Sequence, residues 1–497
     1  MDSAVTETLR QAGHPWKAAL ASGVGSMLEF YDFFIYSPMA ALVFAKIFFP
    51  ASAPGTGTLL ALATFAVGFV ARPIGGLISG HFGDRVGRRP MLVASFLFTG
   101  AVTFSVGLLP TYGQVGIWAP ILLVTLRFLQ GVGLGGEWGG AALLAVEHAP
   151  PGRKAFFGSI VSASAPVGVI LANGVVALLT AALTEEQMLA WGWRLPFLVS
   201  VVLVLVGLVL RLKVEESPDF ARTKKTARTK ETARTKETTR AKETTHRNEA
   251  ARTEDTGRAD GDQQAVRPPG RERERGRTPV LEAVTRYPKQ ILSVIGIHIG
   301  PTTVGFLSGA FLVGYAEAVM GISASVALTG NIVGSVVNLL LTPLAGRLAD
   351  RFGQRGVLLT GGAAVALWGL PMVWLLNTHS VAALFCVFIG GSLTQALLSA
   401  PEPAYFASLF PPEVRYSGMS IGYQTATILG GGAGPLIAQA LVNGAGGSVQ
   451  PVGFQVLVAG LLVLAAVLLV RPLAAPTDGT GRTGHGSTTR TGSPQQA

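Results

Sequence analysis

The chain alternates between long apolar runs and short polar connections along most of its 497 residues. A helix that crosses a membrane needs roughly 20 mostly apolar residues. Six such runs precede a long polar segment and six follow it. The first six lie near 17–45, 58–80, 90–109, 116–141, 156–182 and 195–212, and the second six near 290–315, 324–346, 356–376, 380–402, 417–443 and 451–470. The pattern predicts an all-α integral membrane protein with twelve transmembrane helices in two six-helix bundles.

A charged turn occurs once in each group of six, between the second and third apolar runs. Residues 80–89 read GHFGDRVGRR and residues 346–355 read GRLADRFGQR. The first turn contains Gly80, Asp84, Arg85, Gly87, Arg88 and Arg89, and the second contains Gly346, Asp350, Arg351, Gly353 and Arg355, with Gln354 in the place of Arg88. Parallel repeats of this kind build transporters whose transport path lies between the repeats. We therefore expect two copies of one membrane unit, with the charged turns acting as a gate on one side.

Composition supports a membrane protein and excludes other classes. Only 13% of the residues are charged and 49% are hydrophobic, whereas soluble domains carry about 25% charged residues. The formal charge of +11 does not indicate a nucleic-acid partner, because residues 221–278 alone carry 17 Lys or Arg against 10 Asp or Glu. A single cysteine, Cys386, excludes an intrachain disulfide and a cysteine-cluster metal site.

The basic residues of the short connections predict the orientation. Cytoplasmic loops are enriched in Lys and Arg. Both charged turns and the Arg153-Lys154 pair lie in alternate connections, whereas 110–116, 183–190 and 444–450 contain no Lys or Arg. Both termini fall on the basic side. We therefore expect a multi-pass protein of the cell membrane, surrounded by lipid, with the N and C termini in the cytoplasm.

The polar segments divide the chain into regions. The expected organisation is a cytoplasmic N-terminus at 1–16, a bundle at 17–214, a basic cytoplasmic linker at 215–288, a second bundle at 289–472 and a tail at 473–497. The linker begins with three copies of an Ala-Arg-Thr-Lys hexad and has no aromatic residue between 221 and 278. Such sequence cannot bury a core, so the linker and the tail are predicted to be disordered. Binding of the linker to anionic lipid is the alternative to a solvated tether.

Ionisable side chains within a span are costly and therefore mark candidate functional sites. In the first helix, Glu29, Asp32 and Tyr36 share one stripe because they are spaced by three and four residues. Arg127, in the antiparallel fourth helix, lies at a depth similar to that of Asp32. An arginine beside a carboxylate favours its ionised form. We interpret the two as a proton-coupling pair that breaks and re-forms during transport, with a static structural ion pair as the alternative.

Further polar residues inside the spans are candidates with two interpretations each. Glu137 shares a stripe with Gln130 and either takes part in coupling or pairs with an arginine of an inner loop. Arg72, which precedes a proline, is predicted to contact a first-helix carboxylate or a substrate carboxylate. His298 is either a proton carrier or a hydrogen-bonded core histidine. The amides either face a polar substrate or join helices; they are Asn331, Asn338, Gln395 and Gln424.

Several segments in both halves carry a family resemblance. They read EFYDF at 29–33, RPIG at 72–75, QGVGLGGEWGG at 130–140, WGWRLPF at 191–197 and FPPEVRYSG at 410–418. With the two charged turns, they resemble the major facilitator superfamily and, within it, the metabolite:proton symporter family. The resemblance implies the major facilitator fold and proton-driven uptake of shikimate, 2-oxoglutarate, citrate, other carboxylates, proline or betaines. It implies no cofactor, because a proton gradient supplies the energy.

The expected function is proton-coupled symport of a small carboxylate or zwitterionic metabolite by a monomer that alternates access between the two sides. We expect no enzyme, because the sequence contains no Walker, Ser-x-x-Lys, His-Glu-x-x-His or Cys-x-x-Cys motif. The alternative is a transporter-like membrane sensor that signals through the central linker. Two complete charged turns, together with Asp32 and Arg127, favour transport.

Overall fold

The computed structural model describes residues 15–50, 56–212 and 279–472. Every element within these ranges is a helix. Ten of the described helical segments are long and apolar enough to cross a membrane. The first two predicted spans are also helical, over Pro15–Phe34 and Thr56–Val86, but they are not among these ten. The all-α membrane prediction is therefore confirmed, and the count of twelve spans is supported for ten of them.

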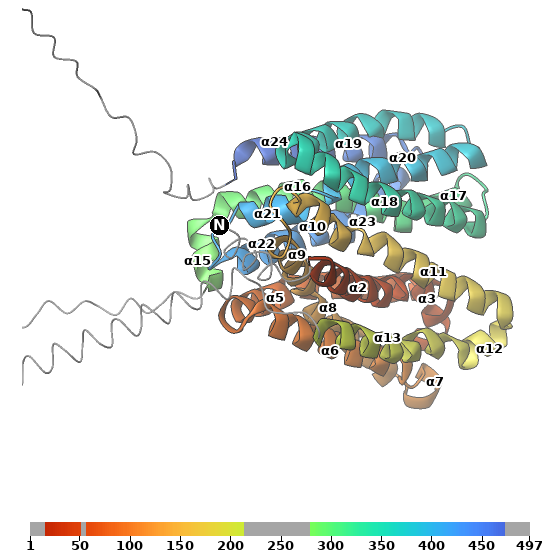
Figure 1. Ribbon diagram of the computed structural model, residues 1–497. Coiled ribbons are helices and arrows are strands. Elements are labelled where there is room, and N and C mark those ends of the chain that lie inside the picture. The colour runs from red at the N-terminus through yellow and green to blue at the C-terminus, as the bar shows by residue number, and fades with distance from the viewer. Residues whose placement is uncertain (1–14, 51–55, 213–278, 473–497) are drawn as a thin grey trace, which may run out of the picture.

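The N-terminal half forms one bundle and the C-terminal half another, and Figure 1 shows the two side by side. The N-terminal half contains α2 (Pro15–Phe34), α3 (Tyr36–Met39), η1 (Ala40–Phe44), α4 (Ala45–Phe48), α5 (Thr56–Val86), α6 (Arg88–Gly107), α7 (Tyr112–Val115), α8 (Trp118–Leu134), α9 (Glu137–Glu147), α10 (Lys154–Ser162), α11 (Ser164–Ala182), α12 (Glu185–Ala190), η2 (Gly192–Arg194) and α13 (Leu195–Leu212). The C-terminal half contains α15 (Pro279–Arg286), α16 (Pro288–Phe306), η3 (Leu307–Phe311), α17 (Leu312–Ala318), α18 (Ala324–Phe352), α19 (Gln354–Leu376), α20 (Val381–Ser399), α21 (Glu402–Ser408), α22 (Arg415–Ala426), η4 (Thr427–Gly432), α23 (Ala433–Gly444) and α24 (Gln450–Leu469).

One boundary of the predicted linker is wrong. Residues 215–278, like the first 14 residues and the tail from 473, lie outside the described residues. Residues Pro279–Arg286, however, form α15, although the linker prediction extended to 288. This segment can pack because it contains apolar residues that the preceding sequence lacks. Ala283 is fully buried, and α15 contacts both α22 and α5.

Three membrane helices are interrupted by π-helical turns. These turns are η1, which follows α2 and α3, η3, which follows α16, and η4, which follows α22. A π-turn leaves the regular hydrogen-bond ladder and is frequent at functional sites. Two of the three, η1 and η3, lie in the first helix of each half, so the two copies of the membrane unit share this irregularity.

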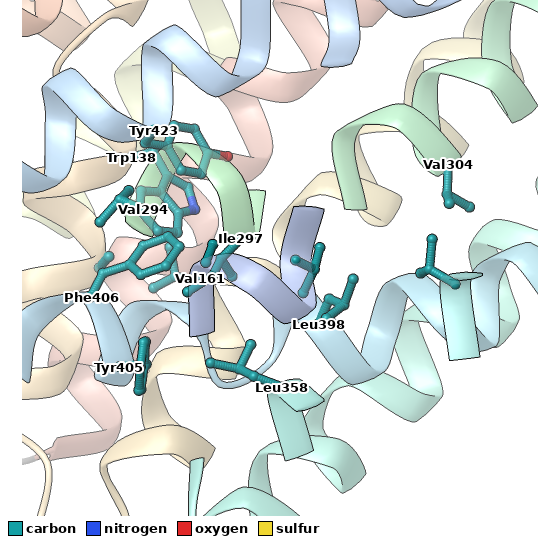
Figure 2. Packing of buried hydrophobic residues seen from close by; sticks show 14 of the residues in the cluster. Trp138, Val161, Val294, Ile297, Val304, Leu358, Leu398, Tyr405, Phe406 and Tyr423 are labelled. Atoms are coloured by element: carbon teal, nitrogen blue, oxygen red, sulfur yellow. The ribbon is translucent and has the colours of Figure 1, made fainter. Parts of the chain in front are cut away.

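The two halves contact one another mainly at one end, which we call the turn end because both charged turns lie there. α5 packs on α22, α10 packs on α18, and α9 contacts α21 and α22. A hydrophobic cluster shared by both halves lies close by and includes Trp138, Phe406 and Tyr423 (Figure 2). At the opposite end, α7, α12 and α17 pack mainly within their own halves. The structure is therefore closed between the halves at the turn end.

Candidate functional site

Among the described residues, four charged side chains are buried together in the interior of the N-terminal half. Asp32 on α2, Arg72 on α5, Arg127 on α8 and Glu137 on α9 are each 5% exposed or less. Glycine lets α5 and α8 approach closely enough to bring the two arginines together. A Cβ atom at Gly135 would lie 2.1 Å from the backbone oxygen of Arg72, so no larger residue fits there.

Arg127 lies at the centre of this group. Its guanidinium donates a hydrogen bond to Gln130 Oε1 and lies 3.4 Å from the centroid of the Tyr36 ring. Gln130 Nε2 in turn donates to Thr103 Oγ1 over 2.8 Å, and Thr103 lies beside the Asp32 carboxylate. Among the described residues no direct ion pair joins Asp32 and Arg127. The predicted pair is therefore present as neighbours linked through an amide and a hydroxyl.

Arg72 lies next to the same site, over an aromatic surface that crosses to the other half. Its guanidinium is 4.2 Å from the centroid of Phe33 and 5.2 Å from that of Phe69. The Arg127 guanidinium is 5.6 Å from the Phe33 centroid, so both cations share this ring. Phe69 contacts Phe306 of the C-terminal half, with ring centroids 5.3 Å apart. Two arginines thus lie beside the interface between the halves, close to the buried carboxylates of Asp32 and Glu137.

The remaining N-terminal candidates have mixed outcomes. Tyr36 lies under Arg127, and its hydroxyl hydrogen-bonds the hydroxyl of Thr64. Glu137 is fully buried and lies close enough to Asp32 to interact with it electrostatically. The side chain of Glu29 lies outside the described residues.

The amides of the C-terminal half separate into two groups. Asn338 Nδ2 donates to Gln395 Oε1 over 2.8 Å, and the Thr342 hydroxyl donates to Asn338 Oδ1 over 2.9 Å. These bonds join α18 to α20 and match the helix-joining interpretation. Gln424 is different, because its Oε1 atom is buried without a hydrogen-bond partner among the described atoms. Its side chain also reaches α5 of the other half, 3.5 Å from where a Cβ at Gly76 would lie.

His298 has a buried partner that the sequence analysis missed. His298 Nδ1 lies 2.9 Å from Glu402 Oε2, and both side chains are buried. A signal was available, since Glu402 stands alone among the apolar residues that follow α20, between two prolines. The predicted span near 380–402 ends at this residue, so the sequence pattern alone places the Glu402 carboxylate at a span boundary.

The second charged turn closes the turn end through a helix terminus. The two carboxylate oxygens of Asp350 accept hydrogen bonds from the backbone amides of Ala155 and Phe156, over 2.8 and 2.9 Å. These amides belong to the first turn of α10, where helical N–H groups have no partner within the helix. A carboxylate at that position is stabilised by the helix dipole as well. Asp350 therefore ties the C-terminal half to the N-terminal half.

The first charged turn has the same backbone placement against the other half. A Cβ at Gly80 would lie 2.8 Å from Ser417 Cα on α22, and one at Gly346 would lie 2.6 Å from the Ser159 hydroxyl on α10. The second glycines, Gly87 and Gly353, have φ angles of 129° and 92°, which favour glycine. The side chains of four residues of the first turn lie outside the described residues: Asp84, Arg85, Arg88 and Arg89.

Further contacts at the turn end come from arginines. Arg415 Nη1 on α22 pairs with Glu147 Oε1 on α9 over 3.0 Å and thus joins the two halves. Arg347 lies 4.8 Å from the Phe156 ring of α10. Arg351 instead lies over the ring of its own neighbour Phe352, 5.2 Å from its centroid. Of the charged residues in the second turn, Asp350 and Arg347 thus contact the other half, whereas Arg351 lies over a ring of its own half.

The chain is similar to known membrane transporters over most of its length. The family described as "Sugar (and other) transporter" matches residues 18–471. The chain is 37% identical over 456 residues to the shikimate transporter of Escherichia coli K12, which covers 91% of this chain and 94% of that protein. It is 36% identical over 458 residues to the inner membrane metabolite transport protein YhjE of the same organism, covering 91% and 93%. It is 28% identical over 472 residues to the Escherichia coli proline/betaine transporter, covering 95% and 87%.

Solved structures show the same fold. The structure of the major facilitator superfamily proton:xylose symporter XylE bound to 6-bromo-6-deoxy-D-glucose aligns with a TM-score of 0.66 at 18% identity. The alignment covers 92% of this chain and 94% of that one. A partially occluded inward open conformation of XylE from Escherichia coli aligns with a TM-score of 0.60.

Proposed function

The chain belongs to the sugar (and other) transporter family of the major facilitator superfamily, and from this premise we propose that it is a proton-coupled symporter of a small carboxylate or zwitterionic metabolite. Its family and its relatives are membrane transporters rather than enzymes. The chain is therefore a multi-pass membrane transporter of small solutes. The solute, the coupling ion and the direction of transport are the proposed part.

The observation that carries the proposal is the pair of buried arginines beside a buried carboxylate. Arg72 and Arg127 share the Phe33 ring at the interface between the halves, and Asp32 lies within the same network. An arginine guanidinium matches the planar geometry of a carboxylate and can hold it through two parallel hydrogen bonds. Shikimate carries a carboxylate, and proline and betaines carry a carboxylate and a cationic nitrogen. These are the solutes named for the relatives, and they suit a site in which two arginines lie close to the carboxylates of Asp32 and Glu137.

The position of Asp32 supports the proposed proton coupling. When Asp32 is ionised, its charge acts on Arg127 and competes with a substrate carboxylate for that guanidinium. A proton on Asp32 removes the competing charge, so a protonated carrier binds the anion more tightly. Proton and substrate then bind together on one side and leave together on the other. Gln130 and Thr103 relay the change, since they link the two groups by hydrogen bonds.

Alternating access requires the closed end to open. In our proposal the turn end faces the cytoplasm, with both chain termini on that side, and the protein lies in the cell membrane. The contacts of Asp350 with α10 and of Arg415 with Glu147 would hold the outward-facing state. Opening toward the cytoplasm would break both. A carrier that works this way needs one copy of the chain, and we propose a monomer without a cofactor.

The test is substrate-dependent transport by the purified protein. A thermal-shift screen against shikimate, 2-oxoglutarate, citrate, proline and glycine betaine selects the solute, because a ligand that binds only the folded state raises its stability. Uptake of the labelled solute into liposomes is then measured with and without an inward proton gradient. We expect accumulation above the external concentration only with the gradient. Binding without uptake would instead favour the sensor that signals through the linker.

A further inference from the structure

A stack of aromatic rings crosses the interface between the halves near the turn end. Trp138 on α9 stacks on Tyr423 of α22, with ring centroids 3.8 Å apart and planes 13° from parallel. Tyr423 stacks on the imidazole of His298 on α16, also at 3.8 Å. Figure 2 shows Trp138 beside Tyr423 and above Phe406. The N-terminal half thus places one side chain, Trp138, over a histidine of the C-terminal half, with Tyr423 between them.

The histidine beneath this stack belongs to a buried ionisable pair that the proposed transport site does not use. His298 is 5% exposed and Glu402 is 1% exposed. The pair is joined by one hydrogen bond, from Nδ1 to Oε2. His298 Nε2 and Glu402 Oε1 have no hydrogen-bond partner among the described atoms. Buried polar atoms without a partner are uncommon in native structures, and each one calls for an explanation.

Two titratable side chains contact the imidazole of His298 in the described part of the chain. The titratable side chains that contact the imidazole are Glu402 and Tyr423. Glu137 is the residue before Trp138 and is the carboxylate nearest in sequence to that end of the stack. Other helices packed against α16 carry their titratable side chains elsewhere. Arg355 lies in the first turn of α19, and Arg415 and Tyr416 lie in the first turn of α22. On α15, Glu282 and Arg286 pair with each other. Cys386 on α20 is exposed. Within the described residues α23, α24 and η4 contribute none.

We propose that His298 and Glu402 form a second proton-binding site, and that Trp138 controls its access from the turn end. The proposal rests on the proposed alternating access. In the closed state Trp138 and Tyr423 cover the imidazole. When the halves part at the turn end, Trp138 moves away with α9 and water reaches the pair. A proton bound at Nε2 is then released to that water, and Nδ1–H remains hydrogen-bonded to Glu402.

The direction of the pH effect follows from charge balance. A neutral imidazole beside an ionised Glu402 leaves one uncompensated negative charge in the buried pair, which is costly away from water. A proton on Nε2 neutralises the pair, and the imidazolium is attracted to the face of Tyr423. The closed state therefore binds the proton more tightly than the open, hydrated state. By linkage, acid favours the closed turn end and alkali favours its opening.

The test measures the distance between the halves as a function of pH without any substrate. Nitroxides are attached at Leu212→Cys and Leu469→Cys in a Cys386→Ala background, both at exposed helix ends that carry no proposed role. Pulsed electron paramagnetic resonance of the purified protein in nanodiscs then gives the two populations. We expect the open population to grow between about pH 5 and about pH 8. If one proton is released on opening, the ratio of open to closed molecules changes by at most about tenfold per pH unit.

Variants separate the pair from other titrating groups. His298→Gln can still donate to Glu402 but cannot be protonated, so the pH dependence should disappear. Glu402→Gln should remove the response or reverse its sign, because a proton on His298 beside a neutral partner creates an uncompensated charge instead of removing one. The matched control is His148→Gln, since His148 is also buried but bonds the backbone oxygen of Leu144. This control should keep the full pH dependence of the parent.

Two outcomes would overturn the proposal: a parent protein whose distances do not change with pH, or a His298→Gln variant that responds as the parent does. If His298→Gln does not fold, Trp138→Phe provides the second variant. This variant reduces the ring area that stacks on Tyr423 across the interface. It should therefore favour the open state at every pH while the dependence of the populations on pH is retained. None of these measurements requires transport. Failure of solute uptake would therefore count against the proposed function and leave this inference standing.

Discussion

The two halves of the molecule use opposite chemistry in their interiors. The N-terminal half holds four buried charged side chains, Asp32, Arg72, Arg127 and Glu137, close to the interface. The C-terminal half instead holds amides, of which two hydrogen-bond one another, and one separate ionisable pair. Since both halves are copies of one membrane unit, the difference arises from side chains and not from backbone. In our proposal the N-terminal half provides the charges that bind the solute and couple its transport to protons, and the C-terminal half provides the facing surface.

The two charged turns, in contrast, have similar backbone placement in both halves. In each copy the first glycine packs against the start of a helix in the other half, and the second glycine has a positive φ angle. Gln354 replaces an arginine in the second turn without changing this placement. The proposed gate is therefore duplicated, whereas the proposed transport site is not. The predictions below test this division.

The largest effect is expected for Arg127→Ala. The substitution leaves Asp32 and Gln130 without their cationic neighbour and removes a proposed anchor for the substrate carboxylate. Losing one member of a buried charged group costs about 3–5 kcal/mol when the other charge remains. We expect both gradient-driven uptake and counterflow in liposomes to fall below detection.

Arg194→Ala provides the control for this prediction. Arg194 is a partly buried arginine of the same half that bonds only backbone oxygens, those of Gly107 and Leu109. Its substitution should lower the melting temperature while coupled uptake persists in the folded fraction. Counterflow at the parent rate in the Arg127 variant would contradict the proposed site.

The second prediction concerns Asp32→Asn, which should separate coupling from binding. Asparagine resembles protonated aspartate, so the carrier should behave as if permanently protonated. Accumulation against a concentration gradient should be lost, whereas counterflow, which needs no net proton movement, should be retained in part. A variant that still concentrates solute in response to a proton gradient would assign Asp32 a structural role, and Glu29 would become the next candidate.

The third prediction compares the two turns through Asp350→Asn and Asp84→Asn. At Asp350 the change removes the charge and one of two acceptor oxygens from the N-terminus of α10. One charge-assisted hydrogen bond contributes about 1.5–3 kcal/mol, and a loss of that size shifts the open and closed populations by roughly ten- to a hundredfold. We expect the turn end to open, as measured by the same nitroxide pair, and uptake to fall strongly.

Asp84→Asn should have a similar effect if the gate is symmetric. Its turn packs against α22 as the second turn packs against α10, so the duplicated backbone predicts a duplicated capping contact. An Asp84 variant that leaves the distances and the uptake unchanged would show that only one of the two turns acts as a latch.

A smaller effect is expected in the C-terminal half, where two amides can be compared. Gln424 has a free acceptor at the interface, so Gln424→Ala should weaken substrate binding by the worth of one hydrogen bond, about 0.5–1.5 kcal/mol or roughly two- to tenfold. Asn338→Ala breaks a bond that joins two helices of one half. It should lower thermal stability and leave the apparent affinity unchanged. Equal effects on affinity would remove the distinction between the amides.

The sequence predicted the features that depend on local pattern. Apolar runs of membrane length, the repeated turns and the alternation of basic loops each follow from composition over short windows. The structure places Asp350 between the halves and Arg127 beside Gln130, and the roles predicted for these residues stay predictions. What the pattern could not provide was the distance between helices, which depends on how glycines such as Gly135 let backbones approach.

For that reason the Asp32–Arg127 pair was predicted as a direct contact. Helical depth alone places the two residues at one level but leaves their side-chain partners open. Glu402 was missed for a related cause. Its importance depends on His298, which is 104 residues away in sequence, and a pairing over that separation is visible only once α16 and α21 are packed together.

The smallest effect is expected for the basic linker, which lies outside both halves. Deleting residues 222–277 removes no described contact, so folding and uptake should persist provided the remaining ten residues bridge the gap between Leu212 and Pro279. A fully extended chain of that length reaches at most about 33–36 Å.

A second variant replaces the same residues by a Gly-Ser segment of equal length, which restores the length of the linker without restoring its sequence. Loss of uptake in the deletion alone would identify tether length as the cause. Loss in both, with folded protein, would show that the repeat sequence itself takes part and would favour a signalling role for the linker.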